Sequence, residues 1–130
     1  MKTRAVSLAV MMILAGSAAA HADGDAVAGK TVFNKCRACH DATGDKNKVG
    51  PNLATVMGRT AGTLESFGRK FSKAMIAAGE GGLVWDEATM AAYLAAPKAK
   101  VPGTNMAFAG LKKDDEIANV IAYLKADPKP

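Results

Sequence analysis

The 130-residue sequence is poor in aromatic side chains and in long apolar runs. Aromatic residues make up 5% of the chain, and they do not alternate with basic residues as they do on nucleic-acid-binding surfaces. The longest unbroken apolar run, residues 8–15, is much shorter than the ~20 residues that a membrane-spanning helix needs. This composition argues against nucleic acid as a partner and against stable membrane insertion.

The sequence also lacks the alternation of apolar and polar residues that is typical of β-strands, and it shows no internal repeat. A chain of this length, with 49% hydrophobic residues, can bury one compact core but not two. We therefore expect a single all-α domain.

The N-terminal segment has the features of a secretory signal peptide. Lys2 and Arg4 precede the apolar run, and Ala20-His21-Ala22 follows it as an A-x-A cleavage site. The chain is thus predicted to consist of a signal peptide, 1–22, and a domain, 23–130. Loss of Lys2 and Arg4 leaves 15 basic and 12 acidic residues, a net charge of +3. Export places the domain in the periplasm, where free thiols are oxidised.

Both cysteines of the chain lie in the pentapeptide CRACH, which ends at His40. Cysteines at this spacing form redox disulfides, zinc sites or covalent haem attachments. A thioredoxin-like disulfide needs a preceding strand, and zinc needs four ligands, whereas the exported domain offers two cysteines and one histidine. Haem attachment uses all three side chains, with Cys36 and Cys39 bonded to the haem and His40 bound to iron. The motif alone favours haem and leaves the other two chemistries open.

A second iron ligand has to come from another part of the domain. His21 leaves with the signal peptide, so the candidates are the methionines that remain: Met57, Met75, Met90 and Met106. The first three lie in patterns typical of core residues. Met106 lies in a segment where Pro97, Pro102 and Gly103 predict a loop without regular helix, which is a suitable place for a thioether ligand.

Helical patterns lie at both ends of the domain and at three places between them. The first helix is expected to open near Asp25 and to run into Cys36. The last is expected to follow Asp114, with one apolar face made of Ile117, Val120, Ile121 and Leu124. Because glycine inside a helix costs about 1 kcal/mol against alanine, Gly29 predicts that the terminal helices cross at that residue. Short helices are expected near 52–57, 73–78 and 87–96, the last two capped by Ser72 and Asp86.

The sequence resembles the class I c-type cytochromes, and among them the small soluble cytochromes c of proteobacteria and mitochondria. The similar segments follow one another in the family's order: GDAVAGKTVFNKCRACH, KVGPNL, LVWDEATMAAYLAAPKAKVPGTNMAF and DDEIANVIAYL. The resemblance implies a cytochrome c fold of four or five helices around one haem c. It implies thioether bonds at Cys36 and Cys39, axial iron ligands at His40 and Met106, and no catalytic residues.

The resemblance also implies supporting roles beside the haem: Pro51 as carbonyl acceptor for the ring N–H of His40, Arg59 and Trp85 beside a haem propionate, and Tyr93 and Thr104 near Met106. Phe71 stands where many relatives carry a tyrosine, in a segment, 63–75, that is longer than the familiar version. That position therefore offers no hydroxyl group to a propionate.

Basic residues cluster in sequence around the CRACH motif and the Met106 loop: Lys35, Arg37, Lys46, Lys48, Lys98, Lys100 and Lys112. The acidic residues Asp86, Glu87 and 114–116 are expected in helices, away from this group. A basic ring around the haem edge would steer the protein onto acidic patches of redox partners. The candidate partners are a cytochrome bc complex, a terminal oxidase of a respiratory chain, a photosynthetic reaction centre and a periplasmic dehydrogenase.

The alternative function is a haem enzyme or gas sensor with an open sixth position on the iron. Met106 and the lack of a second histidine in the exported domain argue against it. The sequence therefore predicts a soluble periplasmic one-electron carrier, acting as a monomer.

Overall fold

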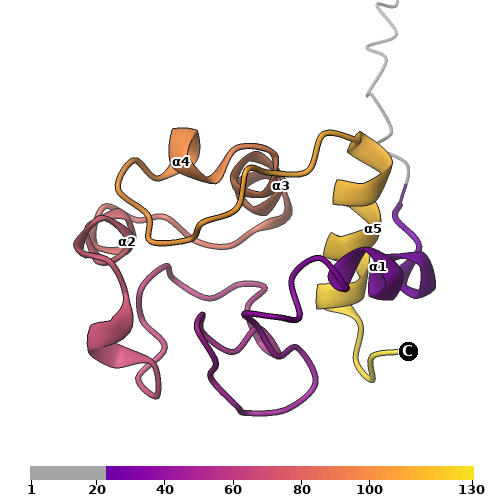
Figure 1. Ribbon diagram of the computed structural model, residues 1–130, viewed down its shortest axis with the longest axis horizontal. Helices are drawn as coiled ribbons and strands as arrows, with labels where there is room; N and C mark the ends of the chain where they lie inside the picture. Colours follow the sequence, from indigo (N-terminus) through magenta and orange to yellow (C-terminus); the bar gives the residue numbers. More distant parts are fainter. Residues whose placement is uncertain (1–22) are drawn as a thin grey trace, which may run out of the picture.

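The computed structural model describes residues 23–130, so the predicted signal peptide at 1–22 lies outside the described residues. Helices joined by long loops make up this part of the chain (Figure 1). In chain order they are α1 (Ala26–Phe33), the 3-10 helix η1 (Gly68–Lys70), α2 (Lys73–Glu80), α3 (Glu87–Ala95), α4 (Pro97–Lys100) and α5 (Asp114–Lys125). Strand-like pairing within residues 23–130 is limited to an isolated bridge between Thr60 and Val84. The all-α prediction is confirmed.

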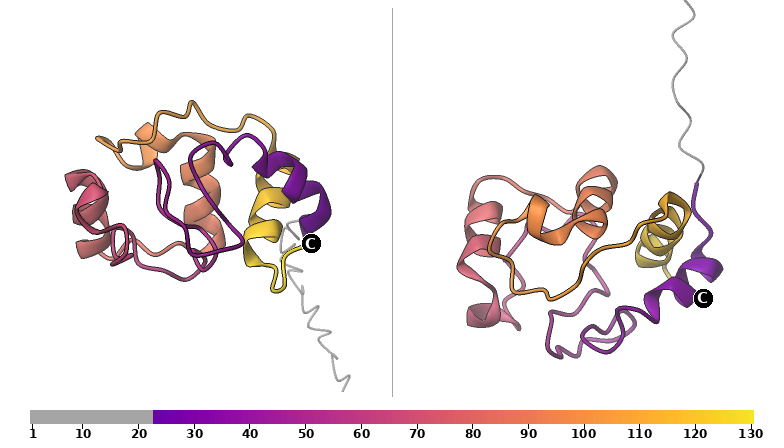
Figure 2. Two further views of the ribbon diagram at one scale, coloured as in Figure 1. Left: turned by 60° about the horizontal axis from the view of Figure 1, so that its bottom comes forward. Right: turned by 45° about the horizontal axis from the view of Figure 1, so that its top comes forward.

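Helices α1 and α5 cross at one end of the molecule, with α2 toward the other end (Figure 1, Figure 2). A Cβ atom added at Gly29 would lie 1.9 Å from the carbonyl oxygen of Asn119, so only glycine lets the two backbones approach this closely. The backbone N–H of Asp25 donates to the Asn119 side chain at 2.8 Å, and the rings of Phe33 and Tyr123 lie 5.4 Å apart. The predicted crossing at Gly29 is confirmed.

The helix starts follow the predicted capping residues, but the end of α1 does not follow the prediction. The side chains of Asp25, Ser72 and Asp86 each accept a backbone N–H from the first turn of α1, α2 and α3. Helix α1 ends at Phe33 instead of running into Cys36. The N–H of Cys36 bonds to the Phe33 carbonyl, three residues back, so the chain tightens into turns before the CRACH motif.

Two further predictions about helices are wrong. Residues 52–57 form turns, because the Asn52 side chain accepts the N–H of Ala54 at 2.8 Å and so competes with a helical bond. Conversely, the segment that begins at Pro97 was predicted to contain no regular helix, but Pro97 is the first residue of the short helix α4. Proline is tolerated there because the first residue of a helix needs no N–H for an intrahelical hydrogen bond. Helix α2 also continues two residues beyond the expected end, to Glu80.

The core combines buried side chains of α1, α2, α3 and α5 with buried residues of the loops between them. The predicted apolar face of α5 is buried, and Tyr123 joins it. Met75 and Met90 are buried core residues as predicted, whereas Met57 is only half-buried. Among residues 23–130, no helix combines the length and the apolar composition that crossing a membrane requires.

Candidate functional site

The two cysteines lie in the turns that follow α1. Cys36 is half-buried against the core, Cys39 is exposed, and both are free thiols. Burial raises the pKa of the Cys36 thiol, which is therefore neutral at pH 7. The backbone N–H groups of Cys39 and His40 both donate to the Cys36 carbonyl at 3.0 Å, so one carbonyl group holds the turn that carries all three side chains.

The imidazole ring of His40 is held through one of its two nitrogens. Its Nδ1 lies 2.7 Å from the Pro51 carbonyl oxygen, which can only accept a hydrogen bond. Desolvation lowers the pKa of His40, so the ring is neutral at pH 7 with its proton on Nδ1. A Cβ atom at Gly50 would lie 2.3 Å from the ring carbon Cε1, so glycine is required for this close approach. The lone pair on Nε2 remains available to a metal.

The backbone brings Arg59 beside Trp85. The backbone N–H of Trp85 donates to the Arg59 carbonyl at 2.9 Å, and the backbone N–H of Gly58 donates to the Trp85 carbonyl at 2.9 Å. The Arg59 guanidinium donates to the Asn52 carbonyl at 2.9 Å and to the Thr55 hydroxyl at 3.0 Å. Desolvation lowers the pKa of Arg59, and neither of the ion pairs found within residues 23–130 includes it. A half-buried guanidinium with further N–H donors is suited to bind a carboxylate.

Tyr93, Thr104 and Met106 form a second connected group. The hydroxyl oxygens of Tyr93 and Thr104 lie 2.7 Å apart, and the Met106 N–H donates to the Thr104 hydroxyl at 3.4 Å. Met106 is half-buried in the loop between α4 and α5. The Tyr93 ring packs on Trp85 with 4.9 Å between ring centroids. Burial raises the pKa of Tyr93, which therefore keeps its hydroxyl proton at pH 7.

A continuous chain of contacts thus joins the predicted site residues. It runs from His40 through Pro51 to the adjacent Asn52, and from Asn52 to Arg59. Backbone hydrogen bonds then lead from Arg59 to Trp85, and ring packing leads from Trp85 to Tyr93. The hydroxyl group of Thr104 connects Tyr93 to Met106. The Cys36 carbonyl accepts the N–H groups of Cys39 and His40, so the structure connects every residue that the sequence assigned to the site.

Three residues of this region were not predicted: Asn47, Gly50 and Asn52. Asn52 is 5% exposed and, setting aside Trp and Tyr, is the one buried polar side chain among residues 23–130. Its own backbone N–H donates to the Asn47 side chain at 2.8 Å. An asparagine between Pro51 and Leu53 indicates a turn, but the sequence does not reveal that the turn is buried.

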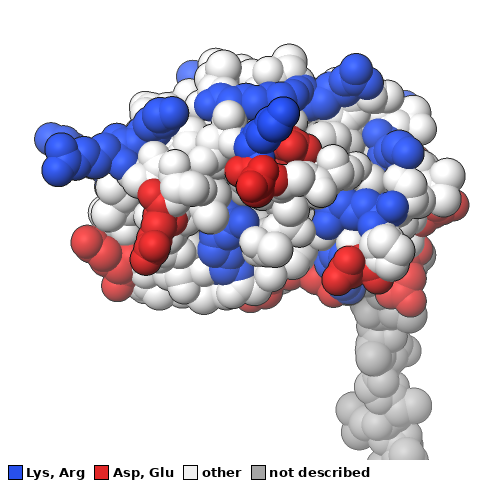
Figure 3. All heavy atoms as spheres, turned by 90° about the horizontal axis from the view of Figure 1, so that it is seen from below, with Lys and Arg blue, Asp and Glu red and all other residues white. Residues whose placement is uncertain are grey.

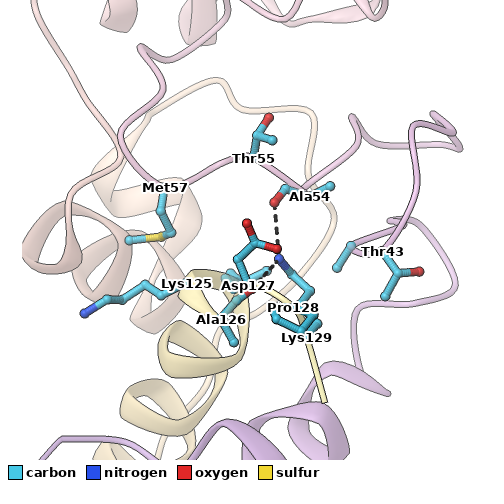
Figure 4. A pocket seen from close by; sticks show the side chains of 11 residues that line it. Thr43, Ala54, Thr55, Met57, Lys125, Ala126, Asp127, Pro128 and Lys129 are labelled. Carbon is cyan, nitrogen blue, oxygen red and sulfur yellow. Dashed lines mark hydrogen bonds between the residues drawn. The ribbon is translucent and has the colours of Figure 1, made fainter.

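Two surface hollows lie outside this group of residues. One, of about 560 Å³, lies beside the C-terminal residues 124–129 and is also lined by Met57 (Figure 4). Lys129 closes part of it by donating to the carbonyls of Ala54 and Ala126, each at 3.2 Å. The other, of about 590 Å³, lies between residues 96–99 and 107–109 and is mostly apolar. None of the predicted site residues lines either hollow.

Basic and acidic side chains are only partly separated on the surface. In the view from below, Lys and Arg form a band along one edge, and most acidic side chains lie nearer the other edge (Figure 3). The expected separation is wrong for Glu116, whose carboxylate oxygens lie 2.8 and 2.9 Å from Lys35 Nζ. Lys35 is therefore paired, because the crossing of α1 and α5 brings the start of α5 near the CRACH motif.

The set of donor groups fits haem. It consists of two thiols separated by two residues, a neutral imidazole with a free Nε2, a half-buried thioether and a half-buried guanidinium for a propionate. Among residues 23–130, no group of three or more His, Cys, Asp or Glu side chains is placed to hold a metal ion.

Comparison with known proteins gives the family. The cytochrome c family model matches residues 26–126. Cytochrome c2 from Afifella marina is 52% identical over 104 residues, which cover 78% of this chain and 82% of the relative. Among solved structures, cytochrome cH from Methylobacterium extorquens has a TM-score of 0.70 at 45% identity, covering 78% of this chain and 98% of that chain. Cytochrome c2 from Rhodospirillum centenum has a TM-score of 0.74 at 38% identity, covering 82% and 100%.

Cys36 and Cys39 belong to a C-x-x-C-H motif in a chain with this fold and these relatives. The chain therefore belongs to the cytochrome c family, whose members are electron carriers with a covalently attached haem c.

Proposed function

We propose that the chain is a periplasmic one-electron carrier in which His40 and Met106 are the axial ligands of the haem iron. The bound haem supplies a one-electron couple between iron(III) and iron(II). The observation that carries the proposal is the 2.7 Å contact between His40 Nδ1 and the Pro51 carbonyl. It fixes the ring tautomer and leaves Nε2 as the nitrogen that can bind iron, next to the two cysteines.

Met106 would be the second iron ligand in this proposal. Its loop is held by the hydroxyl group of Thr104, which also contacts the hydroxyl group of Tyr93. A thioether ligand closes the position that oxygen or peroxide would need, which favours electron transfer over catalysis. Met75 and Met90, by contrast, are buried in the helical core.

Arg59 and Trp85 are proposed to contact a haem propionate. Arg59 has N–H donors beyond the two hydrogen bonds that its guanidinium makes, and Trp85 lies beside it through backbone bonds. Phe71 has no hydroxyl group to offer to this contact, and its ring packs on Phe67 with 4.8 Å between centroids.

The proposal that the protein is exported to the periplasm rests on the predicted signal peptide, 1–22. Its charged start, apolar run and A-x-A site are typical of secretory signals. Cleavage after Ala22 would leave Asp23 as the first residue of a protein of net charge +3.

We further propose that redox partners dock where Lys98 and Lys100 are exposed on α4. Neither side chain makes a hydrogen bond or ion pair within residues 23–130, and Lys98 lines the apolar hollow between 96–99 and 107–109. Acidic patches on a cytochrome bc complex, a terminal oxidase, a photosynthetic reaction centre or a periplasmic dehydrogenase would complement this surface. The carrier acts as a monomer in this proposal.

Two measurements on the exported protein test the proposal. Intact mass after boiling in reductant should equal a chain that starts at Asp23 plus one haem, because thioether bonds survive reduction. The optical spectrum of the oxidised protein should show the weak sulfur-to-iron band near the red edge. Alkylation of both Cys36 and Cys39 after reduction, or a high-spin spectrum, would contradict the proposal.

A further inference from the structure

We infer that Asn47 is a positioning residue for His40, and that it acts through the peptide bond between Pro51 and Asn52. The inference rests on the proposed role of His40 as an iron ligand. The Pro51 carbonyl faces His40 Nδ1 at 2.7 Å. On the other side of the same peptide unit, the Asn52 N–H donates to the Asn47 side-chain oxygen at 2.8 Å.

The planarity of the peptide bond couples these two contacts. In a trans peptide the C=O and the N–H lie in one plane and point in opposite directions. The carbonyl of Pro51 therefore cannot turn away from His40 unless the N–H of Asn52 also turns away from Asn47. The ring nitrogen of Pro51 belongs to the preceding peptide unit and carries no N–H, so the hydrogen bonds that fix this plane are those of the Pro51 C=O and the Asn52 N–H. Asn47 is thus the residue that holds the far end of the unit.

Asn52 makes the unit rigid. Its side-chain amide donates to the Gly44 carbonyl and accepts the N–H of Ala54 at 2.8 Å. Its backbone carbonyl accepts from Arg59 at 2.9 Å. Rotation of the peptide unit would break bonds to a residue that is 5% exposed, where water cannot readily replace them.

The hydrogen bonds also run in one direction. The His40 ring donates to Pro51, Asn52 donates to Asn47, and the Asn47 amide donates to the Ser66 hydroxyl at 3.0 Å. Amide groups linked in this way polarise one another, so each bond strengthens the next. Asn47 and Ser66 together should therefore make the Pro51 carbonyl a stronger acceptor.

A stronger acceptor at Nδ1 makes the imidazole a more electron-rich ligand. An electron-rich ligand stabilises iron(III) relative to iron(II). Loss of the Asn47 contact should consequently raise the midpoint potential, and it should weaken the hydrogen bond at His40 Nδ1.

The test compares the holoproteins of the parent, Asn47→Leu and Ser66→Ala. Leucine has the size of asparagine but cannot accept the Asn52 N–H, and Ser66→Ala removes only the last, exposed link of the series. Asn47→Leu should raise the equilibrium ratio of reduced to oxidised protein about threefold at fixed potential, and Ser66→Ala should raise it by less. The NMR signal of the His40 Nδ1 proton in the reduced protein should move upfield in the same order.

Asn119→Leu is the matched control, because the Asn119 side chain also accepts a backbone N–H, from Asp25 at 2.8 Å, but lies at the crossing of α1 and α5, outside the series of hydrogen bonds that includes His40. It should lower stability and leave both the potential and the His40 signal unchanged. The inference would be overturned if the potential and the His40 Nδ1 signal stayed unchanged in Asn47→Leu and Ser66→Ala. It would also be overturned if Asn119→Leu shifted both by as much as Asn47→Leu does. If Asn47→Leu does not fold, Asn47→Asp, which keeps the acceptor oxygen, must retain the downfield His40 signal, and loss of that signal counts against the inference.

The same spectra separate this inference from the proposed function. If His40 is the iron ligand, the carbon-bound protons of its ring in the reduced parent lie far upfield because of the haem ring current, unlike the hydrogen-bonded Nδ1 proton. Ordinary positions for these carbon-bound protons would refute the proposed function itself. Upfield carbon-bound protons, together with an Nδ1 signal that does not respond to Asn47→Leu, would refute only the inference.

Discussion

The hydroxyl oxygens of Tyr93 and Thr104 lie 2.7 Å apart. Tyr93 belongs to α3, whereas Thr104 belongs to the loop that carries Met106 and accepts the Met106 N–H through the same hydroxyl. Helix α3 therefore anchors the loop at a point two residues from the proposed ligand.

The variant Tyr93→Phe should loosen this loop. It removes one hydrogen bond and keeps the ring that packs on Trp85, so the free energy of unfolding should fall by about 1 kcal/mol. Carbon monoxide should bind the reduced protein faster, because Met106 leaves the iron more often. Tyr123→Phe is the control, since the Tyr123 hydroxyl makes no hydrogen bond within residues 23–130 and its ring lies against Phe33. Equal rates of carbon monoxide binding in the two variants would contradict the proposed anchoring role of Tyr93.

Substitution of Met106 should change the ligation of the iron, whereas substitution of the buried methionines should not. Met106→Ala is expected to abolish the sulfur-to-iron band and to let carbon monoxide bind the reduced protein. Met75→Ala and Met90→Ala should each cost ~2–5 kcal/mol in the free energy of unfolding and leave the spectrum as it is. Optical spectra and urea unfolding of the three holoproteins distinguish a loss of iron ligation from a loss of stability. Exclusion of carbon monoxide by Met106→Ala would place the ligand elsewhere.

Charge reversal should slow electron transfer only on the proposed docking surface. Lys98 lies on α4 and Lys30 on α1, which are well separated in two directions of view (Figure 1, Figure 2). Lys98→Glu should therefore reduce the bimolecular rate with a cytochrome bc complex or an oxidase at low salt more than Lys30→Glu does. The difference should vanish as ionic strength approaches ~0.15 M, where the screening length is about 8 Å. Stopped-flow rates that fall equally in both variants would mean that only net charge matters.

The crossing of α1 and α5 should tolerate no side chain at Gly29. Gly29→Ala would place a Cβ atom 1.9 Å from the Asn119 carbonyl oxygen, so the two backbones must move apart. We expect a loss of ~1–3 kcal/mol in the free energy of unfolding, despite the better helix propensity of alanine. Gly81→Ala is the control, because its nearest contact would be an ordinary 3.4 Å. Urea unfolding that shows Gly29→Ala as stable as the parent would contradict the close approach.

Local signals in the sequence predicted a large part of this fold. The period of apolar residues identified α5, the capping side chains located the starts of α2 and α3, and Gly29 located the helix crossing. These features depend on residues within one or two helical turns, or on one residue whose size is decisive. The site motif was also local, because C-x-x-C-H lies within five consecutive residues.

The features that the sequence did not predict depend on contacts between distant residues. Asn47 and Asn52 stabilise turns at 44–54 through bonds from side chain to backbone, and such bonds leave no periodic pattern. The pairing of Lys35 with Glu116 spans 81 residues and follows from the helix crossing. The end of α1 at Phe33 reflects tight turns that its helical pattern does not reveal.

The crossing of the terminal helices also bears on the order in which the chain can complete its structure. Gly29, Val32 and Phe33 are the buried residues of α1, and the helix that packs on α1, α5, is synthesised after the other described helices. A polypeptide interrupted before Asp114 would keep the apolar side of α1 uncovered, directly next to the two thiols. Closure of the fold over this segment must therefore wait for α5, and until then the CRACH turn belongs to an open, accessible chain.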